Sequence, residues 1–183
     1  MNTINRGRLA AACAAGFVVS QSVPAFGDEP LEGCYTPVRG WATSICTESA
    51  DCSTQEGLYR IVLLNESAPP GLRRLELSGT FEGKLVQMPN ACGAATAEHV
   101  LNDRRSMGTI TTGPDVGCFT GVGDFVNSMQ IVETLVVSSG SGIYQHIVPG
   151  GTVTLTGRLG LKTGINRFRV TPGPGDEVCF SNP

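Results

Sequence analysis

Hydrophobic and polar residues alternate along two long stretches of the chain, residues 72–88 and 152–161. In the first stretch most apolar side chains share one parity: Leu75, Leu77, Phe81 and Leu85. In the second stretch they do so again: Val153, Leu155, Leu159 and Leu161. Hydroxyl and charged side chains occupy most of the opposite parity. A period of two residues is typical of a strand with one buried and one wet face, so each stretch predicts a long β-strand.

Shorter apolar runs separated by turn-forming residues predict further strands. They lie at residues 58–64, 96–101, 107–112, 128–138 and 165–171. Glycine, proline and serine mark turns between them, for example in "TGPDVG", "SSGSG" and "VPGG". No long segment has a convincing helical period, apart from a candidate turn at 48–57. The fold is therefore expected to be all-β.

Strands in this number and at this spacing suit either a β-sandwich or a β-barrel. The alternating runs contain glycines at Gly79, Gly83, Gly157 and Gly160. Glycine relieves crowding where strands coil sharply to close a barrel. We therefore favour a single antiparallel β-barrel of about eight strands, calycin-like in architecture, over a sandwich.

The N-terminus has the pattern of a secretory signal peptide. Arg6 and Arg8 precede the apolar run "LAAACAAGFVV", and Ala25 and Gly27 make a small-residue cleavage pattern. A lipoprotein signal at Cys13 is the alternative. The apolar run is about half the length that a spanning helix needs, so we expect no membrane span.

These patterns divide the chain into three parts: a signal peptide at 1–27, a disulfide-stapled, mostly irregular lead-in at 28–57 and the barrel at 58–183. Export would place the protein in the periplasm or outside the cell. The net charge of the whole chain is −3. Loss of the first part removes two arginines and no acid, which leaves 11 basic and 16 acidic residues, or −5. An acidic balance argues against a nucleic-acid or anionic-membrane partner.

The expected mature chain keeps six cysteines, an even number: Cys34, Cys46, Cys52, Cys92, Cys118 and Cys179. In an exported chain this favours three disulfides. Six cysteines permit 15 pairings, and spacing does not choose among them. Cys46 with Cys52 is the easiest local pair, and Cys34 with Cys179 would suit a closed fold whose ends meet. Thiol catalysis and metal binding are disfavoured because the chain has no Cys-x-x-Cys motif.

The glycine-rich stretch 136–157 does not fit a nucleotide-binding loop. Gln145 stands where a dinucleotide fingerprint needs its third glycine, and a strand pattern follows where that fold needs a helix. We interpret the stretch as a bend between barrel strands. The two histidines, His99 and His146, lack further ligands at short spacing, since Asp103 would lie ~13 Å along a strand from His99. We therefore expect no metal site and no cofactor.

Glu133 is the most unusual charged residue of the strand patterns. It shares parity with Ile131 and Leu135, whereas most other acidic residues lie on polar parities or in turns. If that parity faces inward, burial would raise the pKa of the carboxyl group and suit it to general acid or base catalysis. The alternative is that Val132 and Val136 face inward and Glu133 faces water.

Other candidates would bind rather than transform a ligand. Arg104 and Arg105 belong either to a solvated hairpin end or to a charged barrel mouth that orients an acidic group. Tyr144 and His146 share a parity near another strand end and are candidates for the rim. Phe81 and Phe168 are expected to line the barrel interior, together with the inward leucines and valines.

The run "VETLVVSSGSGIYQHIVPGGTVTLTGRLGLKTGINRF", preceded by "HVLNDRRSMGTITTG", resembles bacterial proteins of the allene oxide cyclase and dirigent-type barrel superfamily. Their recurring pattern is "GGTGxFxGAxG" followed by "xxTLTGxxxLxTG". Here Ser139 and Ser141 replace glycine and threonine, and "HIVPG" replaces the central "GA" with one extra residue. The resemblance covers roughly residues 72–171. It implies an eight-stranded antiparallel barrel with an apolar interior and, in many relatives, a dimer or trimer.

Plant members of that superfamily guide the cyclisation of a fatty-acid epoxide or the stereochemistry of radical coupling without a cofactor. Their cavity residues lie outside the shared pattern, so the resemblance transfers no catalytic residue to this chain. We expect a binding or interaction module for an apolar small molecule, or an oligomeric structural protein, without demonstrable catalysis. The alternative is a cofactor-free isomerase or cyclase in which Glu133 is the acid or base and Arg104, Arg105 or Tyr144 orients the substrate.

Overall fold

A computed structural model describes residues 31–47, 52–87, 95–120 and 128–182. The described chain forms nine strands and one short 3-10 helix, η1. In chain order they are β1 (Gly33–Cys46), β2 (Thr54–Leu64), β3 (Arg74–Gln87), β4 (Ala95–Asp103), β5 (Thr109–Phe119), β6 (Met129–Gly140), η1 (Gly142–Tyr144), β7 (Thr152–Leu159), β8 (Ile165–Val170) and β9 (Val178–Phe180). These residues contain no helix that is both long and apolar enough to cross a membrane.

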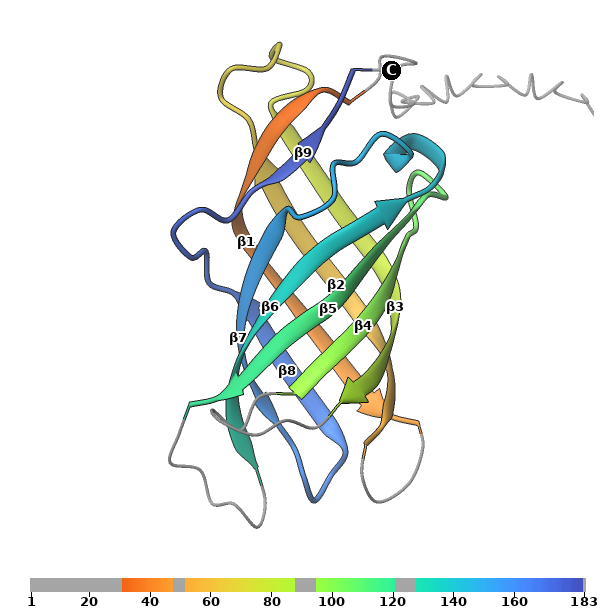
Figure 1. Cartoon of the computed structure of the whole chain (residues 1–183), viewed down its shortest axis with the longest axis vertical. Helices are drawn as coiled ribbons and strands as arrows, with labels where there is room; N and C mark the ends of the chain where they lie inside the picture. The colour runs from red at the N-terminus through yellow and green to blue at the C-terminus, as the bar shows by residue number, and fades with distance from the viewer. Residues whose placement is uncertain (1–30, 48–51, 88–94, 121–127, 183) are drawn as a thin grey trace, which may run out of the picture.

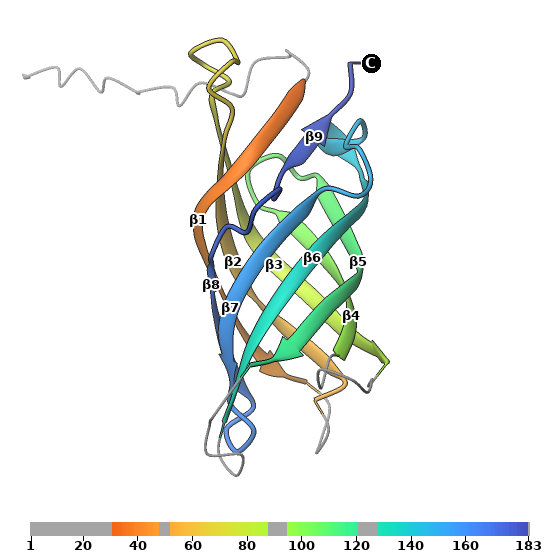
Figure 2. The same cartoon turned by 60° about the vertical axis from the view of Figure 1, so that its left-hand side comes forward.

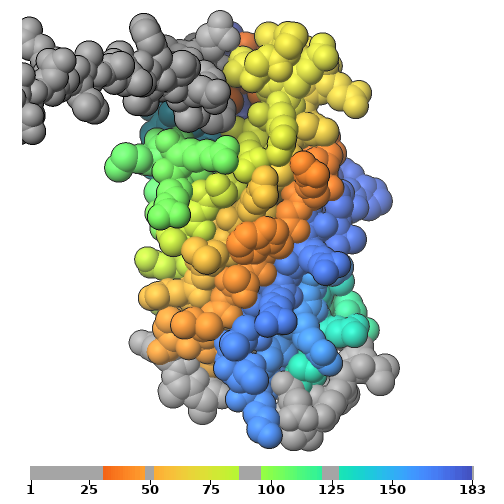
Figure 3. All heavy atoms as spheres, turned by 180° about the vertical axis from the view of Figure 1, so that it is seen from behind, coloured from red at the N-terminus to blue at the C-terminus, as the bar shows by residue number. Residues whose placement is uncertain are grey.

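The strands β1 to β8 form a closed antiparallel barrel (Figure 1). Each strand pairs with its neighbours in the chain, and β1 closes the sheet by pairing with both β2 and β8. Figure 2 shows the steep tilt of the strands, and Figure 3 shows the closing seam, where β1 (orange) lies beside the blue residues of β8. The expected all-β fold, a single antiparallel barrel of eight strands, is confirmed.

The alternating stretches form β3 and β7, and the shorter predicted strands correspond to β2, β4, β5, β6 and β8. The lead-in differs from the expectation, because most of it is β1 rather than irregular structure. The sequence pattern did not predict β1, because its inward residues include small and polar ones, Ala42 and Ser44. Its outward residues include the exposed Trp41 and Ile45.

The segment "TGPDVG", read as a turn from its glycine and proline, lies inside β5. The pairing of β5 with β6 shifts register between Thr112 and Val116, which marks a bulge. A proline that cannot donate a ladder hydrogen bond is tolerated at a bulge. The bulge leaves Asp115 fully buried, with no exposed surface.

Two of the expected disulfides are present in the proposed pairs. Cys34–Cys179 joins β1 to β9, and Cys46–Cys52 closes the turn between β1 and β2. Cys118 is also disulfide-bonded, while Cys92 lies outside the described residues.

The two ends of the barrel are different. At one end, which we call the β9 end, the rings of Tyr35 and Tyr144 pack against Phe180 with centroid distances of 5.7 and 6.3 Å. Both tyrosines are almost fully buried, and Ile147 is buried nearby. This aromatic cluster plugs the β9 end. The glycine-rich stretch 136–157 runs from β6 through η1 to β7 at this end, which confirms that it is a bend between strands.

Candidate functional site

A cavity of about 470 Å³ lies inside the barrel at the end opposite β9. Its wall is mainly apolar and comes from all eight barrel strands and the β7–β8 turn, including Leu85, Ala97, Phe119, Met129, Ile131, Leu159, Leu161 and Phe168. Its polar lining residues include Glu133, Gln55 and Asn166. We call this space the end pocket. Its volume lies within the range of about 300–1,000 Å³ that is typical of small-molecule sites.

A second cavity of about 20 Å³ lies deeper in the barrel, with room for about one water molecule. Glu133, Gln55 and Phe168 line both spaces, and His99 and Phe81 line the inner one. Below these residues the barrel is therefore nearly filled by side chains. The polar group around Glu133 forms the floor of the end pocket.

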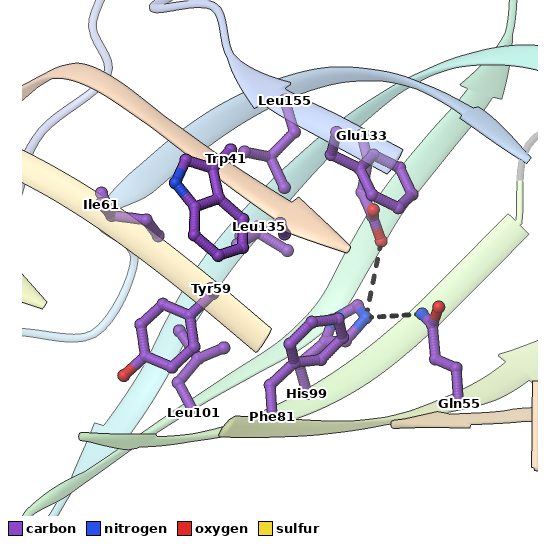
Figure 4. Close-up of a pocket in the computed structure, with 12 residues that line it drawn as sticks. Trp41, Gln55, Tyr59, Ile61, Phe81, His99, Leu101, Glu133, Leu135 and Leu155 are labelled. Atoms are coloured by element: carbon purple, nitrogen blue, oxygen red, sulfur yellow. Dashed lines mark hydrogen bonds and ion pairs between the residues drawn. The ribbon is translucent and has the colours of Figure 1, made fainter. Parts of the chain in front are cut away.

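Glu133 lies on the inward face of β6, between Gly117 of β5 and Leu155 of β7 in the sheet. Its side chain is buried with its neighbours Ile131 and Leu135, so of the two orientations that the sequence left open, the inward one is found. The nearest partner recorded for its carboxylate is His99 Nε2, 3.8 Å from Oε1 (Figure 4). Among the described residues, none donates a hydrogen bond to this carboxylate.

His99 belongs to β4 and is fixed by Asp115 of β5. His99 Nδ1 lies 2.7 Å from Asp115 Oδ2, and both side chains are buried. Asp115 also accepts hydrogen bonds from the Thr112 hydroxyl at 2.6 Å and from the Val136 backbone N–H at 2.6 Å. These three donors engage both carboxylate oxygens. Asp115 therefore places the Nδ1 proton of His99 and orients its ring.

The side chain of Gln55, on β2, contacts the other ring nitrogen of His99, Nε2. Its Oε1 accepts hydrogen bonds from the Ser44 hydroxyl at 2.7 Å and from Asn166 Nδ2 at 3.2 Å. This leaves the Gln55 amide nitrogen to face His99 Nε2 at 3.1 Å. An N–H donor at that nitrogen requires Nε2 to be an acceptor, so the arrangement selects neutral His99 with its proton on Nδ1.

Burial raises the pKa of Glu133, and the negative charge of Asp115 raises it further, although His99 acts in the opposite direction. Burial lowers the pKa of His99, but its hydrogen bond to Asp115 and the negative charges of Glu133 and Asp115 outweigh that effect and raise the pKa. The two groups therefore compete for a proton. The Gln55 donor favours leaving it on Glu133.

This geometry suits proton transfer better than metal binding. Ligand atoms of His99, Asp115 and Glu133 lie within 4.8 Å of one another. However, both Asp115 oxygens already accept hydrogen bonds, and Nδ1 of His99 is committed to Asp115. Only His99 Nε2 and Glu133 remain, whereas zinc sites in proteins usually have three or four protein ligands. A second group, at Cys34, Glu177 and Cys179, contains two cysteines joined in a disulfide.

The structure brings together only some of the candidate residues. Phe81 and Phe168 lie beside Glu133 and line the cavities as expected. Tyr144 is at the β9 end, where it is buried rather than exposed at a rim, and its hydroxyl donates to Asp103 at 2.7 Å. His146 lies near it after η1, with Nε2 3.0 Å from the Gln145 amide.

The two arginine candidates also lie at the β9 end, in the turn between β4 and β5. Both are exposed, and Arg105 forms an ion pair with Glu76 at 3.3 Å. Asp103, at the end of β4, accepts hydrogen bonds from the backbone and hydroxyl of Ser106. This is the arrangement of a hydrogen-bonded hairpin end. Neither Arg104 nor Arg105 lines the end pocket. The β4–β5 turn that carries them lies at the same end of the barrel as β9 (Figure 1).

Sequence reasoning missed His99, Asp115 and Gln55 as parts of the site. A signal existed for His99, because it alternates with Ala97 and Leu101 and so shares an apolar, inward parity. Asp115 was hidden by the apparent turn around it, and Gln55 by the apparent irregularity of the lead-in.

No family model, no curated protein and no solved structure matches the chain. The function must therefore be argued from the end pocket and its floor.

Proposed function

We propose that the barrel binds an apolar small molecule in the end pocket. The observation that carries this proposal is an apolar cavity of about 470 Å³ whose floor holds a buried carboxyl group, to which none of the described residues donates a hydrogen bond. A barrel built only for stability would gain by filling such a space with side chains. An aliphatic and aromatic wall favours a hydrophobic ligand, because burial of apolar surface drives its binding.

The floor predicts one polar feature of that ligand. Glu133 has a raised pKa and Gln55 directs its amide nitrogen toward the same region. A protonated Glu133 is a donor, so the ligand carries a neutral oxygen acceptor at its buried end. A ligand carboxylate there would lie beside Asp115 and an ionisable Glu133, which makes a free acid a poor fit.

Filling the pocket tests this proposal. Ala97 lines the end pocket from β4, and Ala97→Phe should weaken binding of a lipophilic fluorescent probe about tenfold or more, equivalent to ~1.4 kcal/mol. Val100→Phe is the matched control, because Val100 lies on the outer face of the same strand and is 39% exposed. Equal effects of the two changes, with both variants folded, would contradict binding in the end pocket.

Native mass spectrometry of protein purified from its own source is the complementary measurement. A retained lipophilic molecule that Ala97→Phe excludes would support the proposal and identify the ligand. The same spectrum reports whether the protein is a monomer, a dimer or a trimer, which the described chain alone does not test.

A second function is favoured by the Asp115–His99–Glu133 arrangement. A buried acid with a raised pKa beside an oriented imidazole is what a cofactor-free isomerase or cyclase needs to protonate or deprotonate a substrate. In this mechanism Glu133 transfers the proton, His99 stabilises the charge that Glu133 gains or loses, and Asp115 positions His99. The expectation that the barrel is similar to allene oxide cyclases belongs to this alternative.

Deuterium exchange separates the binder from the enzyme. The ligand released from the protein would be incubated in D₂O with the wild type or with Glu133→Gln. An acid or base catalyst should convert it, or incorporate deuterium at carbon, at least ~100-fold faster than the variant does, while both proteins still bind it. Binding without exchange or conversion by the wild type would contradict the enzymatic alternative.

We also propose that the protein works after export. Its disulfides are compatible with an oxidising compartment such as the periplasm or the extracellular medium. The expected signal peptide at 1–27 lies outside the described residues and stays a prediction. The N-terminal sequence of the purified mature protein tests it.

A further inference from the structure

Three arginines gather on the outer wall of the barrel, on the opposite face of the sheet from the end pocket. Arg158 of β7 is the direct cross-strand partner of Arg167 on β8. Arg169 follows two residues later on the same outward face of β8, ~7 Å along the strand. All three side chains are exposed. A protein with a net charge of −3 therefore has a local basic cluster.

None of these three arginines has a carboxylate within 4.0 Å among the described residues. Three other exposed arginines, Arg60, Arg74 and Arg105, differ in that each pairs with Glu76. Like charges directly opposite each other on neighbouring strands are destabilising. A bound negative charge would therefore stabilise the Arg158–Arg167 pair.

The arginines border a shallow hollow of about 850 Å³ on the same wall. Ala42, Gly157 and Phe168 also line the hollow. Thr43 and Thr156 contribute hydroxyls, which contact Asn166 O at 3.0 Å and the Thr171 hydroxyl at 2.6 Å. Trp41 completes the rim, 43% exposed, as the cross-strand neighbour of Arg169. Figure 3 looks onto the side where β1 and β8 meet.

We propose that this wall binds an acidic polysaccharide. Guanidinium groups bind carboxylate and sulfate groups through paired hydrogen bonds. The exposed indole of Trp41 offers an apolar surface for the flat face of a sugar ring, and threonine hydroxyls suit sugar hydroxyls. Each part of the hollow thus matches one chemical feature of a charged sugar chain.

The shape of the wall decides between sources of negative charge. The three arginines lie on two neighbouring strands, and the two on β8 are two residues apart. This spacing fits several anionic groups along one polymer better than a single phosphate. A hollow in a convex barrel wall is accessible to a flexible chain, whereas a flat bilayer would touch the rim first.

Binding of heparin and of polygalacturonate, measured by isothermal titration calorimetry at several salt concentrations, tests the proposal. Arg158→Gln/Arg167→Gln should weaken binding at least tenfold. It should also make the slope of log K against log salt shallower by about 1.5 to 2, as expected when two anionic contacts are lost. Lys84→Gln removes a positive charge from the exposed outer face of β3, away from the hollow, and should change neither quantity by more than about a third.

Trp41→Ala separates a sugar site from a simple basic patch. It should weaken binding about fivefold to tenfold while leaving the salt slope unchanged, because the indole carries no charge. The melting temperature of Arg158→Gln/Arg167→Gln should equal or exceed that of the wild type, since the variant loses a repulsive pair. A folded variant that keeps full affinity would overturn the proposal.

Three further results would also overturn it. These are an equal loss of affinity in the lysine control, complete displacement of the polysaccharide by millimolar inorganic phosphate, and arginine-dependent binding to phosphatidylglycerol vesicles that exceeds binding to the polysaccharides. Phe168 lines both the hollow and the end pocket, so probe binding in the end pocket is measured on the same variants. Arg158→Gln/Arg167→Gln should keep the probe affinity of the wild type, which distinguishes failure of this proposal from failure of the proposed interior ligand.

Discussion

At the scale of single residues, the floor of the end pocket depends on where one proton lies. Asp115 accepts three hydrogen bonds, His99 is oriented by it, and no residue in the described part of the chain donates a hydrogen bond to Glu133. Gln55 presents an N–H to the remaining nitrogen of His99. A buried carboxyl group in these surroundings is more stable protonated than charged. The preference for a proton on Glu133 therefore follows from the burial of its carboxyl group and from the orientation of the Gln55 amide.

We predict that Glu133→Gln changes how stability depends on pH. The folded state raises the pKa of Glu133 above its ordinary value of 4.5, so above that pH the folded protein holds more protons than the unfolded chain. The free energy of unfolding of the wild type should therefore fall as pH rises from about 4.5 toward the raised pKa. In Glu133→Gln this part of the slope is absent, so the variant should gain stability relative to the wild type as the pH rises toward neutrality.

Urea unfolding between pH 4 and pH 8 measures this difference. Glu82→Gln is the control, because Glu82 lies on the exposed outer face of β3 and should leave the profile of the wild type unchanged. Profiles of Glu133→Gln and wild type that run parallel over the whole range would show that burial does not perturb Glu133.

At the scale of elements, sequence patterns identified strands wherever hydrophobic residues face inward and polar residues outward. This holds for β3 and β7, whose parities are clear. It fails for β1, whose inward Ser44 and outward Trp41 and Ile45 reverse the usual preference. The inward Ser44 donates a hydrogen bond to Gln55, which lines the end pocket. This polar residue is therefore inward as part of the hydrogen-bond network at the pocket floor.

The candidate site was harder to predict than the strands. His99, Asp115 and Glu133 come from three successive strands, and only the register between those strands brings them together. Register depends on the bulge in β5, where Gly113 and Pro114 resemble a turn in sequence. A single strand pattern carries no information on such cross-strand contacts, although it did identify the inward Glu133.

The two described disulfides should differ in their effect on stability. Cys34 and Cys179 are 145 residues apart, whereas Cys46 and Cys52 are 6 apart. A crosslink stabilises mainly by restricting the unfolded chain, more so for a longer loop, by ~5 kcal/mol for the first pair and ~2 kcal/mol for the second. Replacing the first pair by serine should therefore lower the free energy of unfolding more than replacing the second.

Chemical denaturation of the two double serine variants checks this order. A smaller effect for Cys34→Ser/Cys179→Ser would show that β9 and the start of β1 are held by their packing alone. That packing includes the edge contact between Tyr35 and Phe180.

At the scale of the whole molecule, the barrel has one plugged end and one end with a cavity. The plugged end is held by aromatic rings and by the buried Asp103, while the other end carries the proton-sharing group. Stability and ligand binding are therefore assigned to opposite ends of one closed sheet. Changes at one end should leave the property of the other end intact.

Tyr144→Phe tests this separation. It removes the hydrogen bond to Asp103 and should lower the free energy of unfolding by about 1.5 kcal/mol, the low end for a bond to a charged group, because Asp103 keeps other donors. Probe binding in the end pocket should stay within twofold of the wild type. A folded Tyr144→Phe with impaired binding would show that the two ends are coupled.

The bond between Cys34 and Cys179 has a topological consequence. It joins the first barrel strand to the last short strand, so the backbone between them and the sulfur bridge form a closed covalent ring. A single cut in an exposed loop such as residues 65–73 would open this ring without releasing a fragment. A protease that nicks the protein once should therefore leave one barrel of unchanged mass, apart from the added water, until a reductant separates the pieces.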